Sequence, residues 1–189
     1  MRCLSLTQPW AWSMMHGPKL VENRTWPCPE HMIGVPFAMH ASAKWDAHGY
    51  EFLLANNVLA PERGSHLYAK SAIIGMQTIL RCLSRETYDL VDERVRREVL
   101  PIEQEVFFFG PFGFVMDHVQ RRPITPIPIP GALGFFTLPD DIAKEVVRRA
   151  GEPHDTLPAP ARAQQTMPWE PPGGLHRSVT RTPGRRGRR

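Results

Sequence analysis

Three charged side chains stand close together near the start of the chain, at a spacing that can bring them to one site. Lys19, Glu22 and Arg24 follow Gly17 in the segment GPKLVENR. Side chains alternate between the two faces of a strand, so Glu22 and Arg24 are expected to share one face. Lys19, at the start of this strand, would lie on the opposite face, but it adjoins the turn and its long side chain can reach either face. The sequence therefore predicts one small site with two cations and one carboxylate.

This combination of side chains fits two kinds of chemistry. Burial lowers the pKa of a lysine and a neighbouring carboxylate raises it, and a lysine with a lowered pKa can act as a nucleophile or a base. Glu22 can accept a hydrogen bond from the amino group of a nucleobase, or serve as the acid and base of an amide hydrolysis. Arg24 can donate two parallel hydrogen bonds to a phosphate or a carbonyl edge. The alternative is a cluster of surface ion pairs without a function.

Aromatic and histidine side chains are further candidates. Trp10 and Trp26 flank the charged segment, and each is either a wall for a flat ligand or a core residue. His40 is expected to be a buried histidine bonded to a backbone group, with a role in lining a pocket as the alternative. The run Phe107–Phe109 favours core packing, and the alternative is a platform on which a base stacks.

Two short elements are expected to position the charged residues. A strand over residues 4–6 precedes a helix over residues 10–16, for which Thr7 is the expected N-cap and Pro9 suits the first turn. Gly17 is expected to end this helix in the left-handed conformation, and Pro18 prevents its continuation. A second strand is then expected to begin at Lys19.

The rest of the chain alternates between apolar strands and amphipathic helices. Strands are expected at residues 35–41, 72–83, 112–117 and 133–138, and helices at 44–57, 84–100 and 140–150, with a loop at 61–65. The last helix is expected to turn Ile142, Val146 and Val147 inward. The charges of residues 84–100 indicate a solvated helical insertion. Prolines between residues 123 and 130 lack a backbone N–H, so this segment is expected to be an edge strand or an extended arm.

Several of these segments together resemble the ASCH family. The segments Gln8–Trp10 and Gly17–Trp26 are similar to its G-x-K-x-x-E-x-R motif. Further similar segments follow in the family's order, at Met39–Ser42, Ala72–Thr78, Gly110–Val115 and Pro130–Phe136. The resemblance covers residues 3–138. It implies an α+β fold, a PUA-like β-barrel of about five to six strands with flanking helices.

The resemblance also implies a function. ASCH domains resemble RNA-binding modules, and a compact subgroup resembles amidohydrolases of N4-acetylcytidine that use a Lys, a Thr and a Glu. In that subgroup the Thr stands three residues after the Lys, where this chain has Glu22. The catalytic residues of an enzyme of this kind would be Lys19 and Glu22. The expected ligand-binding residues are Gln8, Trp10, Lys19, Glu22, Arg24, Trp26 and His40.

Charge divides the chain into two parts. Residues 1–150 carry 16 Lys and Arg against 16 Asp and Glu, and residues 151–189 carry seven Arg against three acidic residues. The first part is expected to be one ASCH-like, PUA-like domain. The second is expected to be a disordered basic tail rich in proline and arginine. A neutral domain does not favour strong non-specific binding of phosphates, which leaves a local pocket as the expected binding site.

The sequence gives little support for a disulfide framework, a metal site, a cofactor site or a membrane span. Three cysteines without a recognisable spacing favour a reducing cytoplasm over a disulfide framework. Cys28 and His31 lack the second pair of ligands that a zinc site needs, and no cofactor-binding loop is present. No apolar run is long enough to span a membrane. The expected partner is therefore RNA or a modified nucleoside, the alternatives are the amidohydrolase and a protein-interaction adaptor, and the oligomeric state is not predicted.

Overall fold

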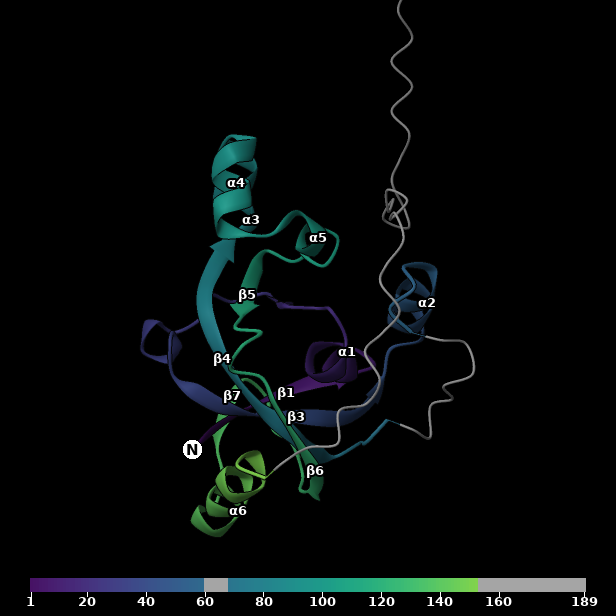
Figure 1. The fold of residues 1–189 in the computed structure, drawn as a ribbon, viewed down its shortest axis with the longest axis vertical. Coiled ribbons are helices and arrows are strands. Elements are labelled where there is room, and N and C mark those ends of the chain that lie inside the picture. Colours follow the sequence, from purple (N-terminus) through teal and green to yellow (C-terminus); the bar gives the residue numbers. More distant parts are fainter. Residues whose placement is uncertain (60–67, 153–189) are drawn as a thin grey trace, which may run out of the picture.

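Residues 1–59 and 68–152 are described by the computed structural model of the chain, which has an α+β fold (Figure 1). The strands are β1 (Arg2–Gln8), β2 (Val21–Arg24), β3 (Pro36–Trp45), β4 (Ala72–Ser84), β5 (Phe112–Met116), β6 (Arg122–Pro128) and β7 (Phe135–Thr137). The helices are α1 (Trp10–His16), α2 (Ala47–Ala55), α3 (Arg85–Leu90), α4 (Glu93–Val99), α5 (Ile102–Glu105) and α6 (Asp140–Ala150), with a 3-10 turn, η1 (Glu30–Met32).

Within the described residues, seven strands form one curved sheet that stays open. Its order is β2-β5-β4-β3-β1-β7, and β6 pairs with β4 beside this path. The long strand β4 connects the two parts of the sheet, because its first half pairs with β3 and β6 and its second half with β5. Figure 1 shows β4 bending along its length. β1 and β3 run parallel, and the other ladders are antiparallel.

The closed barrel of about five to six strands that the sequence predicted is therefore wrong, although the α+β class is confirmed. Closure would need the two ends of the strand order, β2 and β7, to pair, and they do not. A side chain bridges the opening instead. Nη2 of Arg24 donates to the Ser5 carbonyl oxygen at 2.6 Å, so a residue of the predicted site also connects β2 to β1.

Helix α1 has the predicted bounds, but different residues define its ends. Thr7 lies within β1, and the N-cap is Pro9, without a side-chain hydrogen bond. Gly17 has φ −103° and ψ −170°, which is extended, so the predicted left-handed cap is wrong. Glycine is required there for space. A Cβ at Gly17 would lie 2.8 Å from the Ser13 carbonyl oxygen, which accepts the Gly17 N–H.

Replacing Gly17 with valine is expected to lower the free energy of unfolding by about 1 to 3 kcal/mol, the usual cost of overpacking. The new side chain would meet helix backbone, which cannot move aside without bending α1. Chemical denaturation measures the effect. Gly151→Ala is the control, because its Cβ would meet its nearest atom at an ordinary 3.5 Å. Equal denaturation midpoints for both variants would refute the steric account.

Most of the other predicted elements have the expected type but different ends, whereas η1 and α5 were not predicted. The proline-rich segment forms the edge strand β6, as expected. Residues 84–100 divide into α3 and α4, since Val91 and Asp92 are extended. α6 has the predicted bounds and buries Val146, but Val147 is 54% exposed, so its predicted inward position is wrong. The predicted loop at 61–65 and the tail beyond residue 152 lie outside the described residues.

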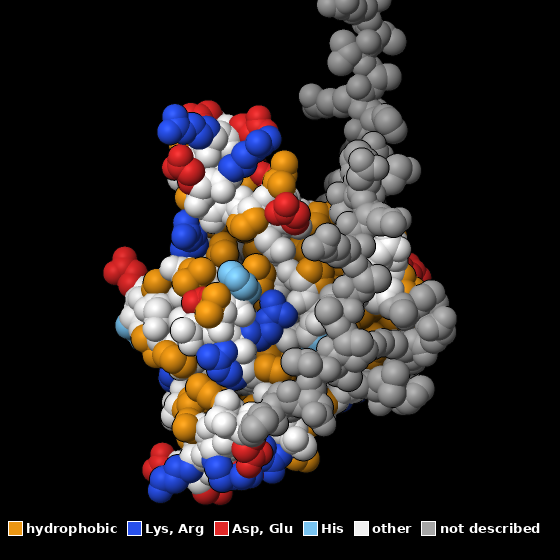
Figure 2. Space-filling view, in the orientation of Figure 1, with side chains coloured by type: hydrophobic (Ala, Val, Ile, Leu, Met, Phe, Trp, Pro, Cys, Tyr) orange, Lys and Arg blue, Asp and Glu red, His pale blue; other side chains and the backbone are white. Residues whose placement is uncertain are grey.

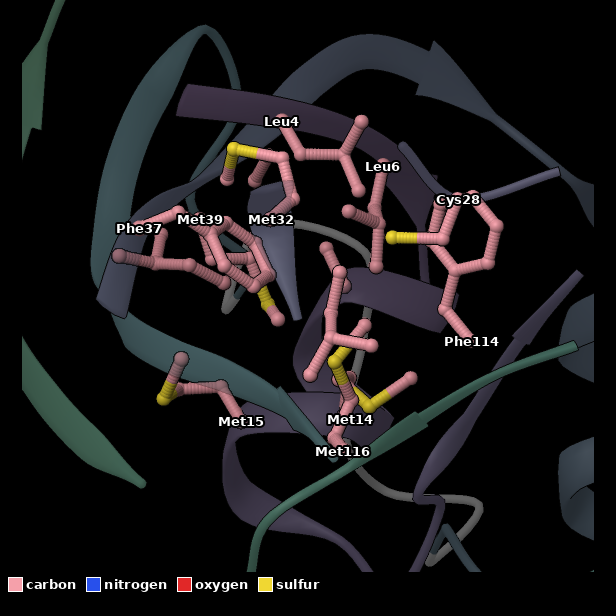
Figure 3. Close-up of a cluster of buried hydrophobic side chains, with 14 residues drawn as sticks. Leu4, Leu6, Met14, Met15, Cys28, Met32, Phe37, Met39, Phe114 and Met116 are labelled. Carbon is pink, nitrogen blue, oxygen red and sulfur yellow. The ribbon is translucent and has the colours of Figure 1, made fainter. Parts of the chain in front are cut away.

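The largest core cluster lies between the curved sheet and α1 and is rich in methionine (Figure 3). Met14 and Met15 of α1 are buried against it. A Cβ at Gly75 of β4 would lie 2.4 Å from Cε of Met15, so α1 packs directly on the sheet there. Flexible methionine side chains fill irregular space well. This packing fixes the end of α1, and with it the turn that carries Lys19.

Charged side chains of both signs gather at the two ends of the molecule, where α4 and α6 lie (Figure 2). They form ion pairs within each helix, such as Arg94 with Glu98 at 3.5 Å and Arg149 with Glu145 at 2.6 Å. The insertion is therefore a solvated helical surface, as the sequence predicted.

Candidate functional site

Lys19, Glu22 and Arg24, here called the charged cluster, form two ion pairs through one carboxylate. Nζ of Lys19 lies 3.2 Å from Oε2 of Glu22, and Nη2 of Arg24 lies 3.1 Å from Oε1. β2 begins at Val21, so Lys19 lies in the turn before the strand and its side chain folds back to Glu22. The structure thus brings together the three charges whose meeting the spacing predicted.

Lys19 is almost fully buried, with 1% of its side chain exposed. Its ammonium group also donates to the Val21 carbonyl oxygen and lies 5.6 Å from the centre of the Trp10 ring. Burial lowers the pKa of Lys19 below its ordinary value, and the carboxylate of Glu22 opposes this effect. Lys19 and Glu22 are buried and Arg24 is partly buried, so the cluster is not an exposed group of ion pairs.

The charged cluster lies in the wall of a cavity of about 550 Å³, here called the main cavity. Ser5 and Thr7 of β1 and Asn23 of β2 also line this cavity. Lys44, at the end of β3, adds a positive charge, and Asp46 adds a negative charge. A volume of this size lies in the range of about 300 to 1,000 Å³ that is typical of small-molecule pockets.

Aromatic side chains form another wall of the main cavity. Trp10, Trp45 and Phe109 line it, and the ring centres of Trp10 and Phe109 lie 5.7 Å apart. Trp10 is held in place because its Nε1 donates to Oδ2 of Asp46 at 2.8 Å. Phe107 and Phe108 are buried, whereas Phe109 is 45% exposed. The phenylalanine run thus supplies two core residues and one cavity residue.

Gln104 of α5 holds the main chain on both sides of Lys19. Its Oε1 accepts a hydrogen bond from the Leu20 N–H at 2.7 Å, and its Nε2 donates to the Pro18 carbonyl oxygen at 2.9 Å. Gln104 is itself buried. Helix α5 therefore fixes where Lys19 enters the cavity wall.

Replacing Gln104 with alanine is expected to lower the free energy of unfolding by about 1 to 3 kcal/mol. The change leaves two main-chain groups without their partner, and unpaired buried polar groups carry a cost of this size. Thermal or chemical unfolding measures it, with Gln120→Ala as the control because Gln120 is exposed. A loss no larger than that of the control would show that Gln104 does not hold the turn.

Asn23 holds the aromatic wall in a similar way. Its Nδ2 donates to the Phe107 carbonyl oxygen at 2.8 Å, and its Oδ1 accepts from the Phe109 and Gly110 N–H groups at 3.0 and 2.8 Å. On the other side of the turn, Nη1 of Arg121 donates to the Gly17 carbonyl oxygen at 2.7 Å. Both ends of the motif segment are thus fixed by side-chain hydrogen bonds.

Two other predicted ligand-binding residues lie away from the main cavity. Gln8 is 1% exposed, and it donates to the Ala69 carbonyl oxygen at 2.7 Å and accepts from the Trp12 N–H at 3.0 Å. Trp26 packs edge-on against Phe114, with ring centres 5.2 Å apart. Its ring also lies 5.8 Å from the Arg24 guanidinium, so Trp26 supports the cluster from outside the cavity.

His40 is buried and bonded to the backbone, as the sequence predicted. Its Nε2 lies 3.0 Å from the Ile129 carbonyl oxygen and its Nδ1 3.0 Å from Oγ of Ser5. Because a carbonyl oxygen only accepts, Nε2 carries the proton and Nδ1 accepts from Ser5. Burial lowers the pKa of His40, which favours this neutral form. His40 does not line the main cavity, but it does line a neighbouring one.

Several cavity and positioning residues were missed by sequence reasoning. Asp46 is the N-cap of α2, and an acidic residue just before a helical pattern is a readable signal for that position. Nothing local marks Gln104, Lys44 or Trp45, because long-range packing brings them to the motif. Within residues 1–59 and 68–152, no group of three metal-ligating side chains is present, and no helix is long and apolar enough to cross a membrane.

Comparison with solved structures finds an ASCH protein from Zymomonas mobilis at a TM-score of 0.43 and 16% sequence identity, covering 78% of this chain and 93% of that one. A mutant form of the same protein aligns with a TM-score of 0.42 and 16% identity, over 78% of this chain and 96% of that one. No protein-family model matches the sequence, and no curated protein matches it. Both of these aligned structures are of an ASCH protein.

Proposed function

We propose that the main cavity binds a nucleobase, either of RNA or of a modified nucleoside. The observation that carries this proposal is the meeting of a buried, charged hydrogen-bonding cluster with an aromatic wall in one cavity. Nucleobases combine a flat face with a polar edge, and proteins recognise them by stacking on aromatic rings and by hydrogen bonds to the edge.

The charged cluster supplies groups for the edge of a base. Glu22 accepts hydrogen bonds and suits an exocyclic amino group. Arg24 lines the main cavity, and its guanidinium, whose Nε has no hydrogen-bond partner within the described residues, can donate to a carbonyl or phosphate oxygen. Trp10 and Phe109 supply the stacking surface. The exposed Lys44 adds positive charge at the mouth, although residues 1–150 carry no net charge.

The lowered pKa of Lys19 favours a second candidate function, hydrolysis of an N-acylated cytidine-like base. In such a reaction water attacks the amide carbonyl carbon, a base takes the water proton, and the amine leaves with that proton as the C–N bond breaks. In this candidate function, Lys19 and Glu22 exchange this proton. Binding alone requires no proton transfer, so a measurement of substrate turnover distinguishes the two functions.

Calorimetry and chromatography together test both functions. Cytidine, the other ribonucleosides and N4-acetylcytidine are titrated into the protein, and release of acetate from N4-acetylcytidine is followed separately. Saturable binding without acetate release supports the binding module, and acetate release that Lys19→Met abolishes supports the enzyme. Arg94→Ala is the control because Arg94 lies on α4 and its side chain is 89% exposed. Absence of both binding and turnover would refute the proposal and leave the adaptor alternative.

A further inference from the structure

A second cavity of about 470 Å³, here called the side cavity, lies beside the main cavity. His40 of β3 and the loop of residues 130–134 between β6 and β7 line it. Four residues line both cavities, namely Ser5, Thr7, Arg24 and Lys44. The cavities are therefore neighbours that meet along β1, at the end of β2 and at the end of β3.

Two cations line the junction of the two cavities. Both cations of the side cavity, Arg24 and Lys44, are residues that it shares with the main cavity, and none of its described lining residues is acidic. The acids Glu22 and Asp46 lie only in the main cavity. Arg24, whose Nε has no hydrogen-bond partner within the described residues, lines both cavities, so their junction suits an anion more than the part of the main cavity that holds the acids.

The far side of the side cavity offers an apolar surface. A Cβ at Gly131 would lie 2.4 Å from Cε1 of His40 and 2.7 Å from Oγ of Ser5, so the loop lies directly against β1 and β3. Two residues further, Leu133 is 99% exposed at the rim. Leu133 lines the side cavity, so its exposed side chain can contact the face of a flat group that enters there.

We propose that the two cavities are successive subsites of one groove for single-stranded RNA, with one base in each and the connecting phosphate at Arg24 and Lys44. This inference rests on the function proposed above for the main cavity. The proposed ligand is therefore a polynucleotide. A free nucleoside would fill only one subsite and would place no phosphate at the junction.

Three probes test the groove by calorimetry: the ribonucleoside that binds most tightly, a dinucleotide that contains it, and the same dinucleotide with a neutral methylphosphonate linkage. The dinucleotide is expected to bind about tenfold to a hundredfold more tightly than the nucleoside, the gain of a charge-assisted phosphate contact. The neutral linkage is expected to remove most of this gain. Higher salt is expected to weaken binding of the charged dinucleotide selectively.

Leu133→Ser tests the side cavity without disturbing the core, because Leu133 is almost fully exposed. It is expected to weaken binding of the dinucleotide about tenfold through lost apolar contact, and to leave that of the nucleoside unchanged. The control variant Arg94→Ala is expected to change neither the affinity for the dinucleotide nor that for the nucleoside.

The outcomes separate this inference from the proposed function. Equal affinity for nucleoside and dinucleotide would overturn the joined groove while retaining the function of the main cavity. Equal affinity for the charged and neutral linkages would overturn the phosphate site. Failure of every nucleoside and dinucleotide to bind would overturn both proposals.

Discussion

Replacing Glu22 with alanine is expected to lower the free energy of unfolding by about 3 to 5 kcal/mol, the usual cost of removing one partner from a buried ion pair. The carboxylate connects two cations, and its own side chain is 11% exposed. Without it, the ammonium group of Lys19 stays buried without a counter-charge. Chemical denaturation at neutral pH measures the change.

The control is Glu93→Ala, which removes an exposed ion pair with Arg97 on α4. Exposed pairs contribute about 0 to 1 kcal/mol, so this variant is expected to unfold almost as the parent does. The double variant Lys19→Met with Glu22→Gln is expected to recover much of the stability, because it leaves no buried ammonium group. Equal losses for Glu22→Ala and Glu93→Ala would contradict the buried cluster.

The loss of folding stability caused by Glu22→Ala is expected to depend on pH. Because the pKa of Lys19 is lowered in the folded state, the unfolded chain binds more protons between that pKa and the ordinary lysine value of about 10.4. Stability therefore rises with pH in this window. Removing Glu22 lowers the pKa further, so the rise begins at a lower pH in the variant. The difference between parent and variant is thus expected to shrink as the pH approaches 10.4.

Replacing Arg24 with alanine is expected to weaken nucleoside or RNA binding about tenfold to more than a hundredfold, corresponding to a lost charge-assisted contact of roughly 1.5 to 3 kcal/mol. Calorimetric titration with the tightest ligand measures the loss. Arg24→Lys is expected to recover only part of the affinity, since a lysine keeps the charge without the planar fork.

Arg94→Ala is the matched control for Arg24→Ala, because it removes the same side chain from an exposed position on α4. Arg24 also donates to the Ser5 carbonyl oxygen, so unfolding of each variant is measured beside binding. Unchanged affinity in a folded Arg24→Ala protein would exclude Arg24 from the binding site.

Local patterns were enough to predict most strands and helices and the meeting of Lys19, Glu22 and Arg24. Period-two alternation identified the strand that carries Glu22 and Arg24, and Pro18 marked the turn at which Lys19 folds back. These features depend on neighbours in sequence. The end of α1 was predicted correctly, but from a left-handed Gly17. Glycine is needed there because the backbone of Ser13 lies close to Gly17, and the sequence alone does not show this contact.

Long-range packing decided the features that the sequence left out. Whether a curved sheet closes depends on which strand ends meet, and Arg24 bridges β2 to β1 without a ladder. Gln104 reaches the Lys19 turn from a distant helix, which no spacing rule predicts. The burial of Lys19 has the same origin. Its spacing fits an exposed ion pair as well as a buried one, and only the surrounding structure distinguishes the two.

The most direct test of the account is nuclear magnetic resonance of the tryptophan indole N–H groups during titration with ribonucleosides and N4-acetylcytidine. Trp10 and Trp45 line the main cavity, whereas Trp26 packs on the core outside it. Single Trp→Phe variants assign the signals. We predict saturable shifts of the Trp10 and Trp45 signals, with that of Trp26 unchanged. Signals of Trp10 and Trp45 that stay fixed with every ligand would contradict a nucleobase site in the main cavity.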